Sequence, residues 1–224
     1  MTESAPGDLW QYEPRRDGRV SLSLDNNIWD WLFDRQDTFR LREELPSNRF
    51  ALVIAREVEI EHRAIPVHKP GKLEKRDFIA ETIRSCGIQT VGYFGFAAPL
   101  GVVDRCLGFD RGTWMSELER ARTQAMRHFL ESKERPTGLA GNEADLRLAV
   151  LAFNSVVLTR DNEPGPLQFA RQRGGKVLLV NDGHALPGCL AAAILATMGT
   201  PQETDWERDC NSSRSAVTAF RQIG

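Results

Sequence analysis

Short apolar runs alternate with amphipathic segments along most of this chain. The runs most typical of β-strands lie at 20–24, 50–55, 156–158 and 177–180. A helical segment at 167–173 separates the last two runs, and a helical crossover returns the chain in the same direction. The pattern therefore predicts an α/β fold with a central, mainly parallel sheet and helices packed against it.

Further helices are predicted from apolar residues at helical spacing. The best patterned lies at 142–153, where apolar residues recur at i, i+3, i+4 and i+7. A longer amphipathic helix is predicted at 114–134. Its expected apolar stripe consists of Leu118, Ala121, Ala125 and Phe129. Both helices are expected to cover the sheet.

The chain is expected to have three parts. Residues 1–19 are polar, contain Pro and Gly, and predict an N-terminal arm that drapes over the surface. Residues 20–185 are expected to form the main domain, with a less regular, helical region inserted at about 67–140. Residues 186–224 are expected to form a C-terminal helical extension.

Composition indicates a folded protein and narrows its class. Hydrophobic residues make up 41% of 224 residues, which with glycine included is in the range of globular proteins. The net charge of −2 provides no general cationic field, so a protein that coats nucleic acid through charge alone is excluded. A nuclease is not excluded, because an acidic metal site offsets basic residues in the total charge.

Cysteine spacing and hydropathy bear on the compartment. The four cysteines are scattered without a Cys-x-x-Cys pair, which predicts reduced thiols. No apolar stretch reaches the roughly 20 residues of a membrane span, and the polar N-terminus is unlike a secretory signal. We expect a cytoplasmic protein that does not enter a membrane.

Four carboxylates stand where they can converge on one edge of the predicted sheet. Asp25 and Asp161 lie at the carboxyl ends of predicted strands, and each is followed by an asparagine. Asp145 lies in the first turn of a predicted helix, and Glu61 follows the strand at 50–55. Ligands of open parallel sheets gather at this edge. Mg²⁺ prefers oxygen ligands and keeps waters that can attack a phosphate.

Each aspartate also has an ordinary structural explanation. Asp25 can cap the following helix, although Asn26 can do so equally well. Asp161 can form an Asx turn. Asp145 stands three residues after Asn142, in an arrangement that resembles a capping box.

Two glutamates compete for the fourth acidic position. Glu59 and Glu61 lie on nearly opposite faces of a helix, because two residues turn it by about 200°. The spacing Val58-x-x-Glu61 favours Glu61, and Glu59 stays open as the alternative.

These segments resemble the PIN-domain nucleases. The matching features are Leu24-Asp25-Asn26, Val58-x-x-Glu61, Asp145 at a helix start, and Leu158-Thr159-Arg160-Asp161-Asn162 before a helix and a strand. The resemblance covers roughly 20–65 and 140–182, so the chain looks like a divergent member with a long middle insertion and a C-terminal extension. It implies a three-layer α/β sandwich with an acidic site that hydrolyses phosphodiester bonds.

The resemblance also implies roles for individual residues. Asp25, Asp145 and Asp161 would bind one or two Mg²⁺ or Mn²⁺ ions, and Glu61 would be a fourth ligand or orient the attacking water. Neighbouring side chains placed to meet the substrate or to hold a ligating carboxylate are Asn26, Arg147, Thr159 and Arg160.

The expected function is that of a metal-dependent endonuclease. RNA is the expected substrate and DNA stays open, as does the choice between a toxin of a toxin–antitoxin pair and an RNA-processing enzyme. A toxin would have an antitoxin-like protein partner, and a homodimer is compatible with the sequence. The alternative, from a different class, is a catalytically inactive PIN-like module that binds protein or RNA.

Overall fold

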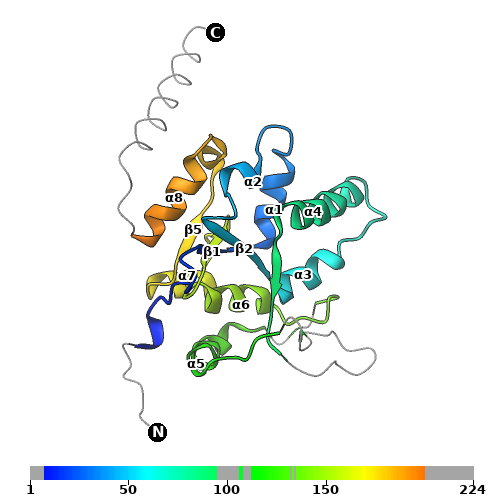
Figure 1. Ribbon diagram of the computed structural model, residues 1–224. Coiled ribbons are helices and arrows are strands. Elements are labelled where there is room, and N and C mark those ends of the chain that lie inside the picture. The colour runs from blue at the N-terminus through cyan, green and yellow to red at the C-terminus, as the bar shows by residue number, and fades with distance from the viewer. Residues whose placement is uncertain (1–7, 95–105, 108–111, 132, 134, 200–224) are drawn as a thin grey trace.

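The computed structural model describes residues 8–94, 106–107, 112–131, 133 and 135–199. Within these residues five strands form one sheet in the order β3-β2-β1-β4-β5, and every neighbouring pair is parallel (Figure 1). The strands are β1 (Val20–Leu24), β2 (Phe50–Ala55), β3 (Gln89–Val91), β4 (Val156–Thr159) and β5 (Val177–Leu179). The predicted α/β fold with a mainly parallel sheet is confirmed.

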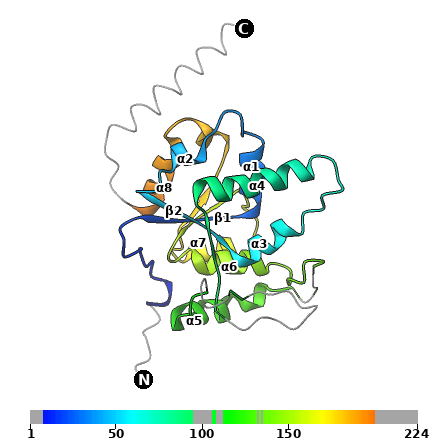
Figure 2. The ribbon, with the colours of Figure 1, turned by 45° about the vertical axis from the view of Figure 1, so that its right-hand side comes forward.

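Helices cover both faces of the sheet and complete a three-layer sandwich (Figures 1 and 2). One layer contains α1 (Asn26–Phe33), α2 (Leu41–Glu44), α4 (Lys72–Cys86) and α8 (Cys189–Met198). The other contains α5 (Glu117–Met126), α6 (Glu143–Leu151) and α7 (Pro166–Gln172). The remaining helical elements are α3 (Arg56–Arg63) and the 3-10 turns η1 (Asp8–Trp10), η2 (Arg127–Phe129) and η3 (Asp182–Ala185).

The two faces of β1 are filled differently. Leu22 and Leu24 are fully buried against the layer of α1, α4 and α8. Ser23 points to the opposite face, as the alternation of a strand requires, and its hydroxyl donates to Ser155 Oγ at 2.9 Å. The central strand is therefore buried on both sides, which fixes the position of the residues that follow it.

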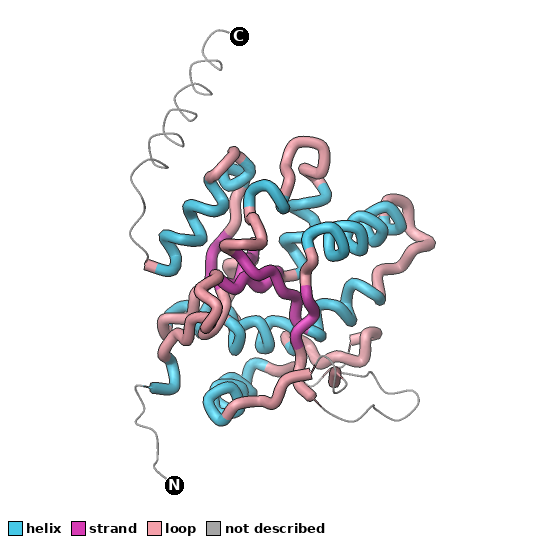
Figure 3. Tube along the Cα trace, in the orientation of Figure 1, coloured by secondary structure: helices cyan, strands magenta, loops and turns pink. Residues whose placement is uncertain are grey.

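The middle region contributes to the layers themselves. β3 pairs with β2 in the register Val53↔Gln89 and forms an edge of the sheet. Ile79 of α4 is buried in the core beside α1. At the other end of the chain, α8 buries Leu190 and Ile194 in the same core. Figure 3 shows these helices packed around the strands. No helix of the described residues is long and apolar enough to cross a bilayer.

The helix predicted at 114–134 is shorter than expected, and its buried side differs. α5 ends at Met126, and Ala121 of the predicted stripe is exposed. Arg122 is buried instead, with 1% exposure, because its guanidinium donates to Leu9 O at 2.6 Å and Gln11 O at 3.0 Å. The N-terminal arm thus supplies the polar partners that allow a buried arginine.

A second anchor of the arm is aromatic. Trp10 packs against Phe153 and Phe169 at ring-centroid distances of 5.3 and 5.8 Å. Glu13 N donates to Phe153 O at 2.7 Å. The described part of the arm therefore lies along the layer formed by α5, α6 and α7.

His62 in α3 is a buried titratable group beside the core formed with α1, α4 and α8. It is 6% exposed, and its ring meets Trp29 edge to face at 5.2 Å. Neither ring nitrogen has a hydrogen-bond partner among the described residues. Burial, reinforced by the positive charge of Lys75, lowers the pKa of His62 to about 4. Between pH 6.5 and pH 4 the unfolded chain binds a proton that the folded chain does not, so the free energy of unfolding falls as the pH falls.

We expect His62→Phe to remove part of this acid sensitivity. The wild type should lose about 2 kcal/mol of unfolding free energy through this group between pH 7 and pH 5, and the variant should not. Urea unfolding at the two pH values measures the difference. The same change at the exposed His68 is the control, and an equal loss in wild type and His62→Phe would contradict the prediction.

Candidate functional site

The strand order creates a switch point between β1 and β4. From β1 the chain builds outward through β2 and β3, then returns to the other side of β1 and continues through β4 and β5. Helices that leave neighbouring strands in opposite directions open a crevice at the carboxyl ends, where ligands of such sheets bind. Leu24 and Leu158 are paired in the sheet, and Asp25 N donates to Leu158 O at 3.1 Å. The residues after β1 and β4 therefore lie side by side.

Asp25 is held at this point by three donors. It is 4% exposed. Its Oδ1 accepts the N–H of Asn26 at 2.6 Å, as the N-cap of α1. Its Oδ2 accepts the amide of Asn27 at 2.8 Å and the hydroxyl of Thr159 at 2.6 Å. Helix capping thus accounts for the contact of Oδ1. It does not account for the contacts of Oδ2, which faces β4. Burial raises the pKa of Asp25, against the lowering effect of these hydrogen bonds.

Thr159 connects the ends of the two strands. Its hydroxyl donates to Asp25 and accepts the N–H of Asp161 at 2.9 Å and the amide of Asn27 at 3.2 Å. Asn27 in turn accepts the N–H of Arg160 at 2.8 Å. The predicted contact of Thr159 with a carboxylate is present. Direct contact with a substrate is not possible in this arrangement, because Thr159 is 0% exposed.

Asp161 lies beside this junction and is half-buried. Its Oδ1 accepts the N–H of Glu163 at 2.8 Å, so the Asx turn considered for it is formed. Its negative charge raises the pKa of both Asp25 and Asp145. Asp161 is thus both a turn residue and a neighbour of the other two aspartates.

Asp145 is an acid of the site whose pKa is strongly raised. Burial, followed by the negative charges of Asp25 and Asp161, raises its pKa to about 6. The capping box considered for it is not formed. Asn142 has a left-handed backbone with φ of 61°, and its side chain donates to Phe129 O at 3.2 Å instead. Within the described part of the chain, no hydrogen bond reaches the Asp145 carboxylate.

Glu61 completes the group from the last turn of α3. Its Oε1 accepts a hydrogen bond from Arg135 at 2.8 Å, and its Oε2 accepts one from the amide of Asn26. Burial raises the pKa of Glu61, Arg135 lowers it, and the negative charge of Asp145 raises it further. Electrostatic coupling therefore links all four acids, Glu61 through Asp145.

Glu59, the alternative fourth acid, faces other partners. Its carboxylate pairs with Arg56 at 2.6 Å and with Arg63 at 2.5 Å along the same helix. Its charge is thus balanced locally. Of the two glutamates, Glu61 is the one that lies beside the aspartates.

The two arginines expected near a phosphate differ in position. Arg147 is buried, with its guanidinium 3.8 Å from the ring centroid of Tyr93 and 3.8 Å from Glu119 Oε1. It contacts α5 through Glu119 and the segment just after β3 through Tyr93, so in this arrangement the side chain is directed into the fold and not toward the predicted phosphate. The side chain of Arg160 is 41% exposed and lies 3.9 Å from Asp182, beside the strand ends.

The sequence interpretation missed two residues of this site. Asn27 bridges Asp25, Thr159 and Arg160, and the run Asp25-Asn26-Asn27 was the available signal. Arg135 reaches Glu61 from a loop 74 positions along the chain. Nothing in its local sequence indicates this contact.

The carboxylates of the site are suitable ligands for a divalent cation, although they are not arranged in the geometry of a metal site. Among the described residues, no group of three or more Asp, Glu, His or Cys side chains could hold a metal ion as arranged. Carboxylate oxygens are nevertheless the ligands that Mg²⁺ and Mn²⁺ prefer. The pKa of Asp25, Glu61 and Asp145 is raised, in each case partly by a neighbouring carboxylate. A cation among them would relieve this repulsion.

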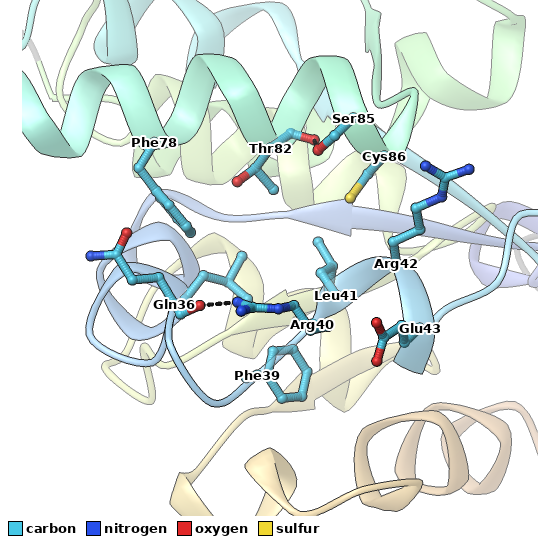
Figure 4. Close-up of a pocket in the computed structure, with 11 residues that line it drawn as sticks. Gln36, Phe39, Arg40, Leu41, Arg42, Glu43, Phe78, Thr82, Ser85 and Cys86 are labelled. Carbon is cyan, nitrogen blue, oxygen red and sulfur yellow. Dashed lines mark hydrogen bonds between the residues drawn. The ribbon is translucent and has the colours of Figure 1, made fainter.

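A separate pocket of about 290 Å³ lies between α4 and the segment from α1 to α2 (Figure 4). Phe39, Leu41 and Phe78 form apolar walls, with Arg42 and Cys86 at one end. None of the four acids lines this pocket. The candidate site is therefore defined by strand ends and charge, and it is distinct from the pocket.

Fold and site together define an all-parallel α/β protein with an acidic cluster at the switch point of its sheet. Comparisons with protein-family models, curated proteins and solved structures found no match. The function is therefore inferred from the side chains of the cluster.

We expect Asp145→Asn to stabilise the folded chain above pH 6. An acid whose pKa is raised by folding is not penalised below its unfolded value near 3.8, and the penalty grows until the pH passes about 6. At pH 8 in EDTA the variant should gain about 1–3 kcal/mol, and at pH 4 it should gain little.

Thermal unfolding at the two pH values tests this expectation. Asp30→Asn, which removes an exposed aspartate of α1 paired with Lys75, is the matched control and should give no gain. An Asp145→Asn variant no more stable than wild type at pH 8 would show that the repulsion is absent.

Proposed function

We propose that the protein is a metal-dependent nuclease that hydrolyses phosphodiester bonds, acting as an endoribonuclease in the cytoplasm. The observation that carries this proposal is the coupling of four carboxylates at the carboxyl ends of β1, β2 and β4. The order of these acids along the chain, with its PIN-like context, supports the same proposal. In the described part of the chain, the free thiol of Cys86 agrees with a reducing compartment.

The proposed mechanism assigns distinct tasks to the acids. Asp25, Asp145 and Asp161 would hold one or two Mg²⁺ or Mn²⁺ ions, and Glu61 would be a further ligand or orient the attacking water. The bound metal would supply Lewis acidity and a water of lowered pKa. Asp145 has a pKa of about 6, so it is largely ionised at pH 7 and available as a ligand.

Other residues of the chain keep the acids in place. Thr159 and Asn27 hold Oδ2 of Asp25, so this carboxylate keeps its orientation when it binds. Asn26 holds Glu61 in the same way from the first turn of α1. Arg160, partly exposed beside the strand ends, is available to contact a phosphate of the substrate.

Partners follow from the proposed activity. RNA is the proposed substrate. A toxin role would add an antitoxin-like protein, and a small DNA-binding protein encoded beside this chain would favour that role over RNA processing. A homodimer is compatible with either role.

We expect Asp25→Asn and Asp161→Asn each to lower the cleavage rate of single-stranded RNA by at least about a hundredfold, because each removes a charged metal ligand. EDTA should abolish the cleavage and Mn²⁺ should restore it. Asp30→Asn, which changes an exposed aspartate of α1, is the control. Cleavage that survives both site variants or EDTA would exclude this mechanism.

The second candidate is a PIN-like module that binds RNA or protein without catalysis. It is favoured by the finding that no three side chains of the described residues are arranged to hold a metal. Calorimetric titration with Mn²⁺ at pH 7.5 separates the two candidates. The nuclease should bind Mn²⁺ and lose this binding in Asp145→Asn, whereas the module should give no binding heat.

A further inference from the structure

Arg135 lies between η2 and α6, where several described residues form backbone hydrogen bonds with one another. Its backbone N–H donates to Leu139 O at 2.8 Å, and Glu131 N donates to Gly141 O at 3.1 Å further down the same loop. Leu139 is fully buried and anchors the loop in the fold. The base of the Arg135 side chain therefore has a defined position over the carboxyl ends of the strands.

The guanidinium of Arg135 reaches the acid cluster from this loop. It lies 2.8 Å from Glu61 Oε1 and lowers the pKa of both Glu61 and Asp145. Within the described residues, it is the one cationic side chain ion-paired with any of the four acids. The side chain is 47% exposed, so it has room to change its rotamer.

Two properties of this contact matter. Water competes for the guanidinium of Arg135, which is 47% exposed, whereas Glu61 is 14% exposed and keeps its place, so a doubly charged ion can displace the guanidinium from Glu61. Once displaced, the planar fork of an arginine suits the oxygens of a phosphate, which it can bind through two hydrogen bonds. Asn26, which holds the other oxygen of Glu61, keeps that carboxylate in place during the exchange.

We propose that Arg135 is a built-in counter-cation of the site: it competes with the divalent ion for Glu61 and, when displaced, binds a phosphate of the RNA. This inference rests on the proposed nuclease function and adds a residue to it. Without metal, the guanidinium of Arg135 thus occupies the position of the ion beside Glu61. With metal bound, it is a substrate-binding residue.

The test begins with Mn²⁺ affinity, measured by calorimetry on the full chain at pH 7.5. Arg135→Gln should bind Mn²⁺ about three- to tenfold more tightly than wild type, the range expected for loss of a weak competing ion pair. Arg63→Gln, which removes an ion pair of Glu59 on the same helix, should leave the affinity unchanged. In a Glu61→Gln background, the effect of Arg135→Gln should disappear, because the two residues act on each other.

The second measurement is RNA affinity in the presence of Mn²⁺, by fluorescence anisotropy with a phosphorothioate oligonucleotide that resists cleavage. Arg135→Gln should bind this RNA about three- to tenfold more weakly, and the salt dependence of binding should fall by about one phosphate contact. If Arg135→Gln binds Mn²⁺ more tightly and RNA more weakly than wild type, Arg135 contacts Glu61 in the metal-free protein and RNA in the metal-bound protein.

The outcomes separate this inference from the proposed function. If wild type binds Mn²⁺ and Arg135→Gln binds it equally or less tightly, or if the gain persists with Glu61→Gln, the inference is overturned and the nuclease proposal stands. Unchanged RNA affinity in Arg135→Gln overturns its second step. If neither protein binds Mn²⁺, both proposals fail. If only Arg135→Gln binds Mn²⁺, the inference is supported, because Arg135 then prevents metal binding in the wild type.

Discussion

The hydrogen bond from Thr159 to Asp25 joins the two halves of the sheet at the point where their directions diverge. β1 and β4 are neighbours although Val156, the first residue of β4, lies 132 positions after Leu24, the last residue of β1, so nothing local in the chain fixes this junction. Their ladder places Leu24 beside Leu158, and the carboxylate and hydroxyl that follow close it. The Thr159 hydroxyl also accepts hydrogen bonds from the backbone N–H of Asp161 and the amide of Asn27. One buried hydroxyl therefore orients the residues at the ends of both strands.

This arrangement costs stability where it brings acids together. Asp145 opens α6, a position that favours a negative charge at the helix terminus, yet burial and two aspartates raise its pKa to about 6. A group selected only for helix stability would not need those neighbours. Groups whose pKa is shifted by burial and by a specific charged partner are enriched at functional sites. The raised pKa values of these neighbouring acids are therefore the physical reason for proposing a function for the cluster.

Much of the fold is predictable because its signals are local. β1 and β2 have the predicted bounds, since charged residues, Asp25 and Arg56, follow their apolar runs directly. Predictions failed where partners come from distant segments. Arg122 is buried because carbonyls of the N-terminal arm receive it, and Arg147 is buried because Tyr93 covers it. Arg135 meets Glu61 through a loop whose position the local sequence does not determine.

The two Asp-Asn pairs illustrate the same limit at the level of single residues. Asp25-Asn26 and Asp161-Asn162 look alike in sequence, and both follow parallel strands. Asp25 starts a helix at once and is enclosed by three donors, whereas Asp161 turns the chain toward Glu163 and stays half-buried. One carboxylate is thus fixed and the other accessible. The proposed site would have to hold an ion and also admit a substrate, and these tasks call for one fixed and one accessible carboxylate. The proposal is therefore supported more by the difference between the two copies than by their similar sequence.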